Sequence, residues 1–484
     1  MVARPDVVSE ASATRAKRLR ERAVAITGRW FDPIDVASLA AFRIAFGGLL
    51  LWEVWRYFRN GWVSTLYDVS AFHFTFAGFG WVKPLPGDGM SLHFFALGLV
   101  AALAAVGLWF RAACLLLSFG WTYVLLIEKT EYLNHQYLIC LLTFLMAFSG
   151  ADRAFSLRAR RRVTPSMVPA WCLWLMRFQI TLPYVFGGIA KLNGDWLHGQ
   201  PMQVWMSRMT HLTDALPFFA ERSTALVFSY GGLLLDLLIV PCLLWKPTRF
   251  WAFIAAIGFH LLNAAMFRIG VFPWLMICAT TLFLPPDWPR RLLRLASPTQ
   301  PIGRIDAGAS RRRPLALTFL TAWMTVQLLV PLRHFLYAGD VAWTEEGARF
   351  SWRMMLTDKA AALRITAHDP ISGRTFLIDP RNSLSSPKQI ERMTQYPDML
   401  HEFSRFISRE LADAGYPQAT VNVLDLVSLN GRKPQPLVDP TIDLGRQPVR
   451  FFSRHPWIMP LTEPRPREPW LPPPTWGGGR GAAE

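Results

Sequence analysis

The sequence is poor in cysteine and holds none of the short motifs that mark the common enzyme classes. It contains no phosphate-binding loop and no HExxH, GxSxG or CxxC motif. No spacing among its five cysteines suits a metal site or a disulfide scaffold, and all five lie in or beside apolar runs: Cys114, Cys140, Cys172, Cys242 and Cys278. The sequence therefore excludes a disulfide-built secreted domain. We expect no metal site and assign the cysteines to core packing.

Acidic side chains are scarce, with 34 Asp and Glu against 51 Lys and Arg, which leaves a net charge of +17. Residues 332–484 carry 19 basic and 17 acidic side chains, so a surplus of 15 positive charges belongs to residues 1–331. The same residues hold most of the long apolar runs. A polybasic membrane surface explains this charge better than a nucleic-acid footprint does, and we expect no nucleic-acid partner.

Long polar stretches are missing from the first 331 residues, most of which fall in apolar runs of about 16–23 residues. A helix needs about 20 such residues to cross a bilayer. The runs 112–127 and 269–285 are the shortest, and a tilted, re-entrant or buried helix fits them as well as a full span does. We predict nine helices, at 36–55, 91–109, 112–127, 132–149, 170–190, 224–245, 250–267, 269–285 and 314–331.

Basic residues also predict the orientation of this bundle. With residue 1 in the cytoplasm, the inner segments hold 22 Lys and Arg, and the outer segments of residues 1–331 hold eight. This bias follows the positive-inside rule and favours an odd number of spans. The first apolar run lacks the cleavage site of a signal peptide. We therefore expect a multi-pass protein in the lipid bilayer, with a cytoplasmic N-terminus and an extracytoplasmic C-terminal region.

The fold class that follows is an all-α polytopic membrane bundle with a C-terminal α+β or β-rich domain. In that domain, two β-prone runs around a turn predict a hairpin at 362–380, and the pattern predicts helix at 387–414 and strand at 418–429. We divide the chain into a basic N-terminal segment, a transmembrane domain, an extracytoplasmic domain and a Pro/Gly-rich disordered tail, at 1–35, 36–331, 332–461 and 462–484.

Lys191 ends the fifth predicted span, one turn after Gly187 and Gly188, which allow another backbone to approach closely. One interpretation is an anchor whose ammonium reaches the outer headgroups. The other is an amine held in an apolar pocket, where desolvation makes it available as a neutral base near pH 7. The residues alone leave both interpretations open.

Four further polar residues lie in the same predicted leaflet or along a nearby span. Asn134 and His135 stand at the outer end of the fourth predicted span, where they fit either a helix cap and an interfacial hydrogen bonder or a pair that orients a substrate. His260 and Asn263 share one face of a helix at spacing i and i+3. They fit either a structural hydrogen bond between helices or the lining of a pocket.

Three charged residues lie inside predicted spans. Arg43 and Arg177 stand toward the inner half, and Asp236 stands near the middle. Because a carboxylate in hydrocarbon needs a cationic partner, we expect these residues to form buried ion pairs rather than to take part in chemistry.

Several dispersed strings, from about residue 38 to about residue 460, resemble the vitamin K-dependent γ-glutamyl carboxylase family, whose membrane part is also called the HTTM domain. The strings that carry the resemblance are LNHQYL (133–138), GIAKLNGDW (188–196), GGLLLDL (231–237), GFHLLNAAMFRIGVF (258–272), FSWRMML (350–356), PDML (397–400) and VDPTIDL (438–444).

The resemblance implies an enzyme that uses a lipid-soluble quinol, either vitamin K hydroquinone or menaquinol, with O2 and CO2 as co-substrates. In the family a lysine deprotonates the quinol, and oxygenation to the epoxide is coupled to carboxylation of glutamyl residues in a peptide or protein. The matching lysine is Lys191, and Asn134 and His135 match the family's Asn-His pair. We extend the resemblance to His260 and Asn263 as residues that line the cofactor pocket.

The chain also departs from the animal members of this family. It has 153 residues after the last predicted span, no cysteine after Cys278, and Arg353 where the animal pattern has an acidic residue. Two other functions therefore stay open. One is a quinol epoxidase-like oxygenase that does not carboxylate a peptide. The other is a noncatalytic membrane scaffold that binds partners through its outer domain.

Overall fold

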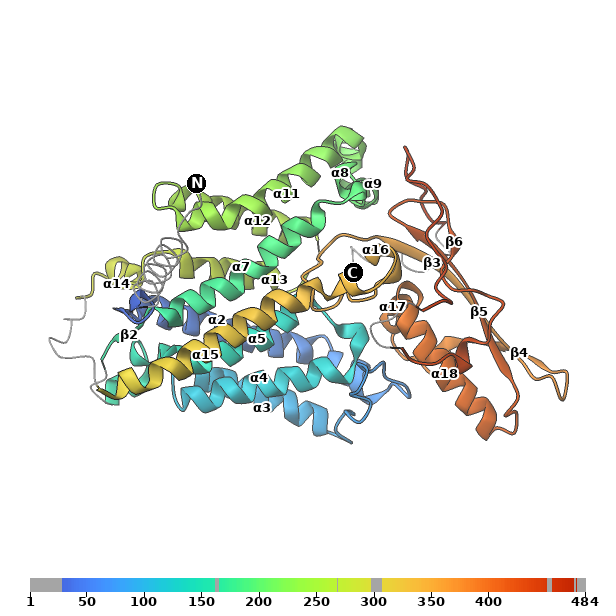
Figure 1. Ribbon diagram of the computed structural model, residues 1–484, viewed down its shortest axis with the longest axis horizontal. Coiled ribbons are helices and arrows are strands. Elements are labelled where there is room, and N and C mark those ends of the chain that lie inside the picture. Colours follow the sequence, from blue (N-terminus) through green and yellow to red (C-terminus); the bar gives the residue numbers. More distant parts are fainter. Residues whose placement is uncertain are drawn as a thin grey trace, which may run out of the picture.

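A helical bundle and a smaller α/β unit at one of its ends make up the structure, which is a computed structural model (Figure 1). It describes residues 28–161, 165–267, 269–296, 307–450, 455–473 and 476, without the side chains of 68, 211, 212 and 307–312. Most of the predicted N-terminal segment, 1–27, and the end of the predicted tail lie outside the described residues.

Helices form at all nine of the apolar runs. Six helices among the described residues are long and apolar enough to cross a membrane, namely α2, α3, α4, α11, α12 and the 313–336 part of α15 with η6. Nine as the number of crossings stays a prediction. The bounds are α2 Ala37–Arg59, α3 Gly89–Val106, α4 Phe110–Ile127, α5 Asn134–Ser149, α7 Trp171–Lys191, α11 Arg222–Leu244, α12 Arg249–Met266, α13 Phe272–Thr280 and α15 Ala307–Leu329, continued by η6 Val330–Leu336.

Short elements connect these helices. Strands β1 Pro33–Asp35 and β2 Met167–Pro169 pair antiparallel and so join the beginnings of α2 and α7. The remaining short elements are η1 Ser64–Asp68, η2 Lys129–Glu131, η3 Ala151–Arg153, α6 Leu157–Arg161, α8 Gly194–Leu197, α9 Met202–Ser207, α10 Thr210–Ala215, η4 Pro217–Ala220, η5 Thr281–Phe283 and α14 Trp288–Leu292.

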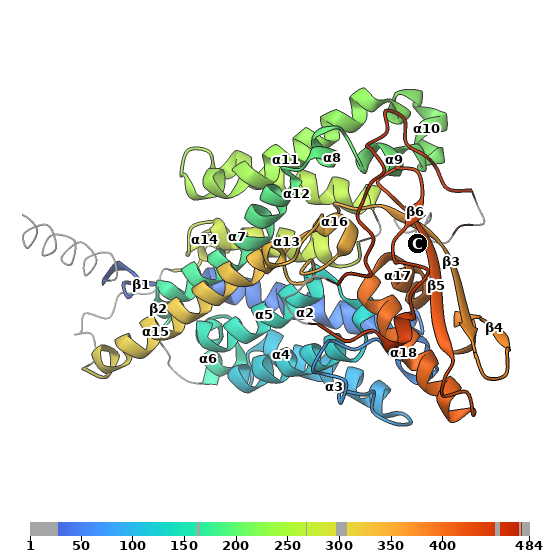
Figure 2. The ribbon, with the colours of Figure 1, turned by 45° about the vertical axis from the view of Figure 1, so that its right-hand side comes forward.

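The C-terminal unit is an antiparallel sheet of four strands in the order β4-β3-β5-β6, with two helices beside it (Figure 2). The predicted hairpin and strand are confirmed. The predicted helix is broken in two at Tyr396, because the residue before a proline disfavours helical geometry. The bounds are α16 Val341–Thr344, β3 Lys359–His368, β4 Thr375–Ile378, η7 Pro380–Asn382, α17 Pro387–Gln395, α18 Pro397–Asp413, β5 Thr420–Leu429, β6 Gln435–Pro436 and η8 Leu444–Arg446.

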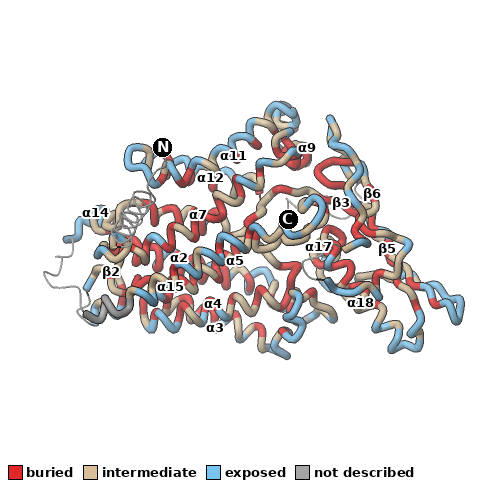
Figure 3. The backbone as a smooth tube through the Cα atoms, viewed as in Figure 1, coloured by how far each residue is buried: buried red, intermediate tan, exposed pale blue. Residues whose placement is uncertain are grey.

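Each part has its own hydrophobic core. In the bundle the ring of Tyr57 stacks on Phe94, with ring centroids 4.6 Å apart, and Trp121 packs edge-on against both. In the C-terminal unit Met393 and Phe403 from the helices pack with the inward side chains of β5. Figure 3 shows buried positions along α2, α5 and α7 and many exposed ones along α3, α11 and α12.

The expectation of ion pairs for Arg43 and Arg177 is wrong for the described residues. Arg43 donates hydrogen bonds to the carbonyl oxygens of Ala151, Ala154 and Phe155, just after the end of α5. Arg177 donates to Leu282 and Leu284, in and just after η5. The last carbonyls of a helix have no partner inside the helix and carry partial negative charge, so they satisfy a buried guanidinium without a carboxylate.

Two polar junctions hold the C-terminal unit against the bundle. At the first, Lys129 in η2 lies 2.9 Å from carboxylate oxygens of both Asp398 and Glu402 on α18. Nearby, Lys388 on α17 pairs with Glu131 at 2.6 Å. Because burial strengthens such contacts by excluding water, this junction stabilises the position of α17 and α18 over the bundle.

Asp195 in α8 forms the second junction, which also holds part of the predicted disordered tail. It accepts hydrogen bonds from Arg432 at 2.7 Å and from Asn430 at 2.9 Å. Arg465 donates to the same carboxylate at 2.9 Å, and Trp470 donates its backbone N–H to Gly431. Residues 462–473 therefore differ from the expected disorder, since specific hydrogen bonds hold them. These contacts offset burial and lower the pKa of Asp195 below its ordinary value.

Asp195→Ala should loosen the C-terminal unit, because it leaves two guanidinium groups with no carboxylate partner. Breaking a largely buried pair costs about 3 kcal/mol. We expect a lower thermal unfolding midpoint and faster proteolysis after residue 430, whereas Asp379→Ala, which breaks an exposed pair with Arg381, should change little. Because the folded pKa of Asp195 is lowered, the stabilisation is present above about pH 4 and is lost as the pH falls through the folded pKa. Equal proteolysis of the two variants would contradict this role.

Candidate functional site

A cavity of about 1520 Å³ lies where the bundle meets the C-terminal unit. Helices α2, α5, α7, α11, α12 and α13 line it on one side, and segments 341–359 and 385–396 line it on the other. Pockets for one small molecule usually measure about 300–1000 Å³, so this cavity has room for more than one ligand. All five predicted site residues line it: Asn134, His135, Lys191, His260 and Asn263.

Lys191 is buried in the wall of this cavity and carries a carboxylate partner. Its side-chain Nζ lies 2.6 Å from Oδ2 of Asp236 on α11 and 5.1 Å from the ring centre of Trp196. Only 7% of Lys191 is exposed, so it does not extend to the outer headgroups as an anchor would. The interpretation of Lys191 as an amine in an apolar pocket is also incomplete, because it did not include the carboxylate of Asp236 beside the amine.

Glycines in α7 make the pairing of Lys191 and Asp236 sterically feasible. A Cβ atom at Gly188 would lie 2.8 Å from the side chain of Leu237 on α11, which is closer than real Cβ contacts. At Gly187 it would lie 3.5 Å from Oδ2 of Asp236 itself. The lack of a side chain at Gly188 therefore allows the close packing of Leu237 against α7, whereas a Cβ atom at Gly187 would make an ordinary contact. That approach brings the two charged groups together.

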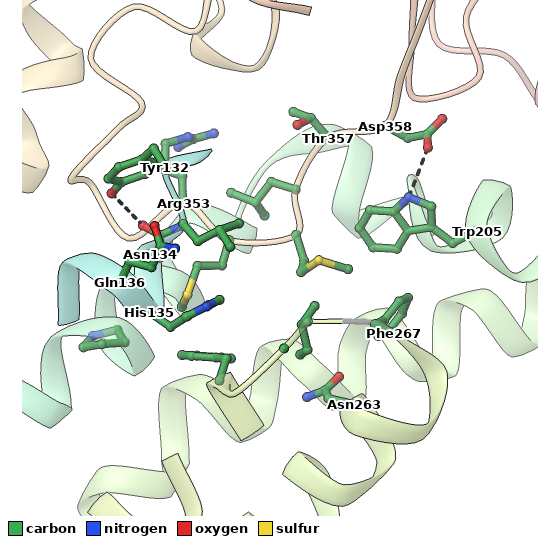
Figure 4. Close-up of a pocket in the computed structure, with 18 of the residues that line it drawn as sticks. Tyr132, Asn134, His135, Gln136, Trp205, Asn263, Phe267, Arg353, Thr357 and Asp358 are labelled. Atoms are coloured by element: carbon green, nitrogen blue, oxygen red, sulfur yellow. Dashed lines mark hydrogen bonds between the residues drawn. The ribbon is translucent and has the colours of Figure 1, made fainter. Parts of the chain in front are cut away.

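Asn134 and His135 lie at the first turn of α5 and point into the cavity (Figure 4). The cap position of α5 is Leu133, so the interpretation of Asn134 as a helix cap is wrong. Instead, the hydroxyl of Tyr132 donates to Oδ1 of Asn134 at 3.1 Å and accepts from the backbone N–H of Phe350 at 2.7 Å. Tyr132 thus connects α5 to the C-terminal segment.

His260 makes the predicted hydrogen bond between helices. Its Nε2 lies 2.7 Å from the hydroxyl of Tyr184 on α7, and His260 is 1% exposed. Its other ring nitrogen, Nδ1, has no hydrogen-bond partner among the described residues. The ring of Phe272 lies 6.2 Å from the ring of His260 and 6.1 Å from the ring of His135. These aromatic and imidazole rings therefore form one continuous patch of the cavity wall.

The five predicted residues share the cavity but do not form one hydrogen-bonded cluster in the described structure. Asn134 and His135 come from α5, and His260 and Asn263 come from α12. Figure 4 shows Asn263 across the cavity from Asn134 and His135. Among the described residues, Lys191 forms a hydrogen bond with Asp236 and with none of the other four. The arrangement thus leaves space between the amine on α7 and the polar groups on α5 and α12, where a ligand could bind.

Charged residues of the C-terminal unit complete the wall. Lys359 donates to Glu345 at 2.9 Å, and burial lowers the pKa of Lys359 despite this carboxylate. Burial raises the pKa of Asp358, although Arg208 forms hydrogen bonds to both of its oxygens. Arg353 also lines the cavity, and it has no hydrogen-bond or ion-pair partner among the described residues. Glu345 and Asp340 interact with Arg353 electrostatically, but neither forms an ion pair with it.

Sequence reasoning missed two features of this site. It singled out Asp236 and Lys191 separately but did not pair them, although two ionisable groups in apolar helices each need a partner. It also missed Tyr184, which orients His260. A tyrosine in an apolar helix is common, so only the fold reveals this role.

Two family models match the chain. The model described as "HTTM domain" matches residues 31–288, and the model described as "Vitamin K-dependent gamma-carboxylase, lumenal domain" matches residues 312–464. The first covers more than half of the chain and corresponds to the bundle. The second corresponds to most of α15, to η6 and to the C-terminal unit. No solved structure matches the chain.

Proposed function

Because the chain belongs to the vitamin K-dependent gamma-carboxylase family, we propose that it is a membrane enzyme that oxygenates a lipid-soluble quinol and couples this reaction to carboxylation of glutamyl residues. The observation that carries the proposal is the buried Lys191–Asp236 pair, which faces a cavity shared by the bundle and the C-terminal unit. The quinol, as vitamin K hydroquinone or menaquinol, would supply the reducing equivalents for O2, and CO2 would be the second co-substrate.

Lys191 acts as the base in this proposal, and Asp236 makes the base available. A protonated lysine cannot accept a proton. Within a pair at 2.6 Å, however, the ammonium proton can pass to the carboxylate oxygen, which leaves a neutral amine and a neutral acid. An apolar environment favours the neutral pair over two charges because burying ions costs solvation free energy. In this neutral pair the acid O–H donates to the lone pair of Lys191 Nζ, so the amine accepts a proton from a quinol hydroxyl once it turns from Asp236 toward the bound quinol.

The polar head of a quinol fits the wall between α5 and α12. The amide of Asn263 offers a hydrogen-bonding group there, and the imidazole of His260 lines the same wall. His135 and the ring of Phe272 provide flat surfaces against which an aromatic ring stacks. We assign His260 and Asn263 to quinol binding, and Asn134 and His135 to orienting the oxygens near Lys191.

Arg353 supplies charge complementarity for a glutamyl substrate. It lines the cavity from the C-terminal unit and has no carboxylate partner among the described residues, unlike Arg349, Lys359 and Lys388. A guanidinium binds a carboxylate through two parallel hydrogen bonds. We therefore assign to Arg353 the binding of a substrate carboxylate at the end of the cavity opposite the bilayer.

The proposed placement in the membrane gives each substrate its own route. Six apolar helices and the two family matches support a membrane protein with an extracytoplasmic C-terminal unit. We propose that the N-terminus is cytoplasmic, as the distribution of basic residues indicates. Quinol then reaches the site from the bilayer, and the peptide reaches it from outside.

The proposed reaction predicts two products from one protein. We expect purified protein in nanodiscs, supplied with reduced naphthoquinone, O2, labelled bicarbonate and a Glu-rich peptide, to form quinone epoxide and labelled peptide together. Liquid chromatography with mass spectrometry measures both. Epoxide without labelled peptide would replace the proposal with the oxygenase alternative. Neither product with phylloquinol or menaquinol would favour the scaffold alternative.

Lys191→Ala should reduce epoxide formation by at least about 10²-fold, because general-base catalysis contributes at least that much. Lys191→Arg should reduce epoxide formation equally, since a guanidinium does not release its proton near pH 7. The matched control is Lys246→Arg, at an exposed position in the loop between α11 and α12. Unchanged turnover in either Lys191 variant, in protein of normal yield, would remove Lys191 from the mechanism.

Arg353→Gln should raise the KM for the Glu peptide about tenfold or more, because a charge-assisted hydrogen bond is worth about 2 kcal/mol. The KM for the quinol should stay the same. Arg364→Gln is the control, since Arg364 is exposed on β3 and does not line the cavity. If both variants have the wild-type KM for peptide, Arg353 does not bind the substrate carboxylate.

A further inference from the structure

Helices α11 and α12 lie side by side at the outer edge of the bundle (Figures 1 and 2). Both are candidate membrane spans, and 17% of the apolar window of α12 is buried. Each has an exposed apolar face, on which Leu234 and Leu238 represent α11 and Phe250 and Trp251 represent α12. In a bilayer these faces contact lipid chains.

The cavity reaches these exposed faces. On α11, Val227 and Gly231 both line the cavity and are exposed at the surface of the chain. On α12, Ala255, Gly258 and Leu262 do the same, at the spacing of one face of a helix. Their neighbours Ile254 and Leu261 are exposed without lining the cavity. The cavity therefore opens sideways, between two helices that face the bilayer.

Glycines keep this opening wide. A Cβ atom at Gly231 or at Gly258 would meet no atom within 4 Å, so each position borders open space. At Gly232 it would meet only Trp196, at 3.7 Å. The residues that border the opening, Val227, Gly231, Ala255, Gly258 and Leu262, are uncharged and apolar. Such a surface suits a hydrocarbon chain and offers no hydrogen bonds to a water-soluble substrate.

The inner end of the opening is polar. His260 lies two residues after Gly258 on α12, is 1% exposed, and has an unpartnered Nδ1. Its Nε2 is occupied by Tyr184. Nδ1 itself has almost no accessible surface, but the His260 ring and the amide of Asn263 line the cavity at this end, so a ligand's polar group binds beside them. A ligand that fits both the polar inner end and the apolar outer border of the opening has a hydrogen-bonding head and an apolar chain.

We infer that the gap between α11 and α12 is a lateral opening that holds the hydrocarbon chain of a lipid-soluble ligand, whose polar head lies at His260. The identity of the head as a naphthoquinol rests on the proposed function. The opening itself rests on the exposed, cavity-lining faces of the two helices. It makes the bilayer the source of this ligand and selects for molecules with a long chain.

Photolabelling tests the opening without requiring turnover. The probe is a naphthoquinone with a long alkyl chain and a diazirine on the ring, dissolved in nanodiscs, and mass spectrometry identifies the labelled residues. We expect labelling of Tyr184 or Phe272 in the unaltered protein. The double variant Gly231→Phe and Gly258→Phe, which fills the gap, should lose at least four-fifths of that labelling.

Two controls separate a blocked opening from a damaged cavity. The first control is Gly48→Phe. Gly48 is also an exposed helical glycine bordered by open space, but it does not line the cavity. This variant should be labelled as strongly as the unaltered protein. A chain-free probe should still label the double variant, because it reaches the cavity past the exposed residues Ser385 and Pro387. Undiminished labelling of the double variant by the long-chain probe overturns the inference, as does equal loss of both probes.

A second probe tests the same inference in the unaltered protein, where no substitution affects folding. With the diazirine at the end of the chain, it should label Val227 or Leu262, and an excess of unlabelled long-chain quinone should compete. Absent labelling, or labelling that resists competition, overturns the inference. Because both probes report binding, a protein that fails to form epoxide still gives a clear result.

Discussion

A lysine and an aspartate meet at 2.6 Å inside the helical bundle, and the rest of the site depends on that contact. Neither side chain is stable alone in an apolar environment, so each requires the other. The requirement brings α7 against α11, and the lack of a side chain at Gly188 lets Leu237 of α11 pack closely there. The same contact holds the amine of Lys191 at the cavity wall. The Lys191–Asp236 pair therefore both stabilises the packing of α7 against α11 and holds the amine that the proposed chemistry needs.

The cavity belongs to both parts of the chain, which explains the strong polar junctions between them. The bundle contributes the lysine, the histidines and the apolar walls, and the C-terminal unit contributes the free guanidinium of Arg353. Asp195 and Lys129 are bundle-side residues at the two junctions. Their carboxylate and ammonium groups bind partners far along the chain, so the position of Arg353 in the cavity wall depends on contacts outside the cavity.

Particular residues show how far sequence reasoning reached. Apolar runs predicted where helices form, because burial along 16 or more residues leaves a clear pattern. The role of Arg43 was wrong, since no pattern indicates that helix-end carbonyls will surround a guanidinium. The break in the predicted helix at Tyr396 could be predicted from the proline that follows it, but sequence reasoning did not use this signal. The predicted disorder differs from the structure over residues 462–473, because the hydrogen bonds that Arg465 and Trp470 form are long-range.

The sequence by itself determined the helical membrane class, the family resemblance and the residue types that a quinol-dependent base reaction needs, because hydropathy and short strings are local properties. Only the tertiary structure decided that Asp236 accompanies Lys191, that Tyr184 occupies one nitrogen of His260, and that α11 and α12 leave a gap toward lipid. The two side-chain contacts join residues 45 and 76 positions apart, and the gap lies between two whole helices. Packing of whole helices brings such residues together, and no local pattern encodes the distance between them.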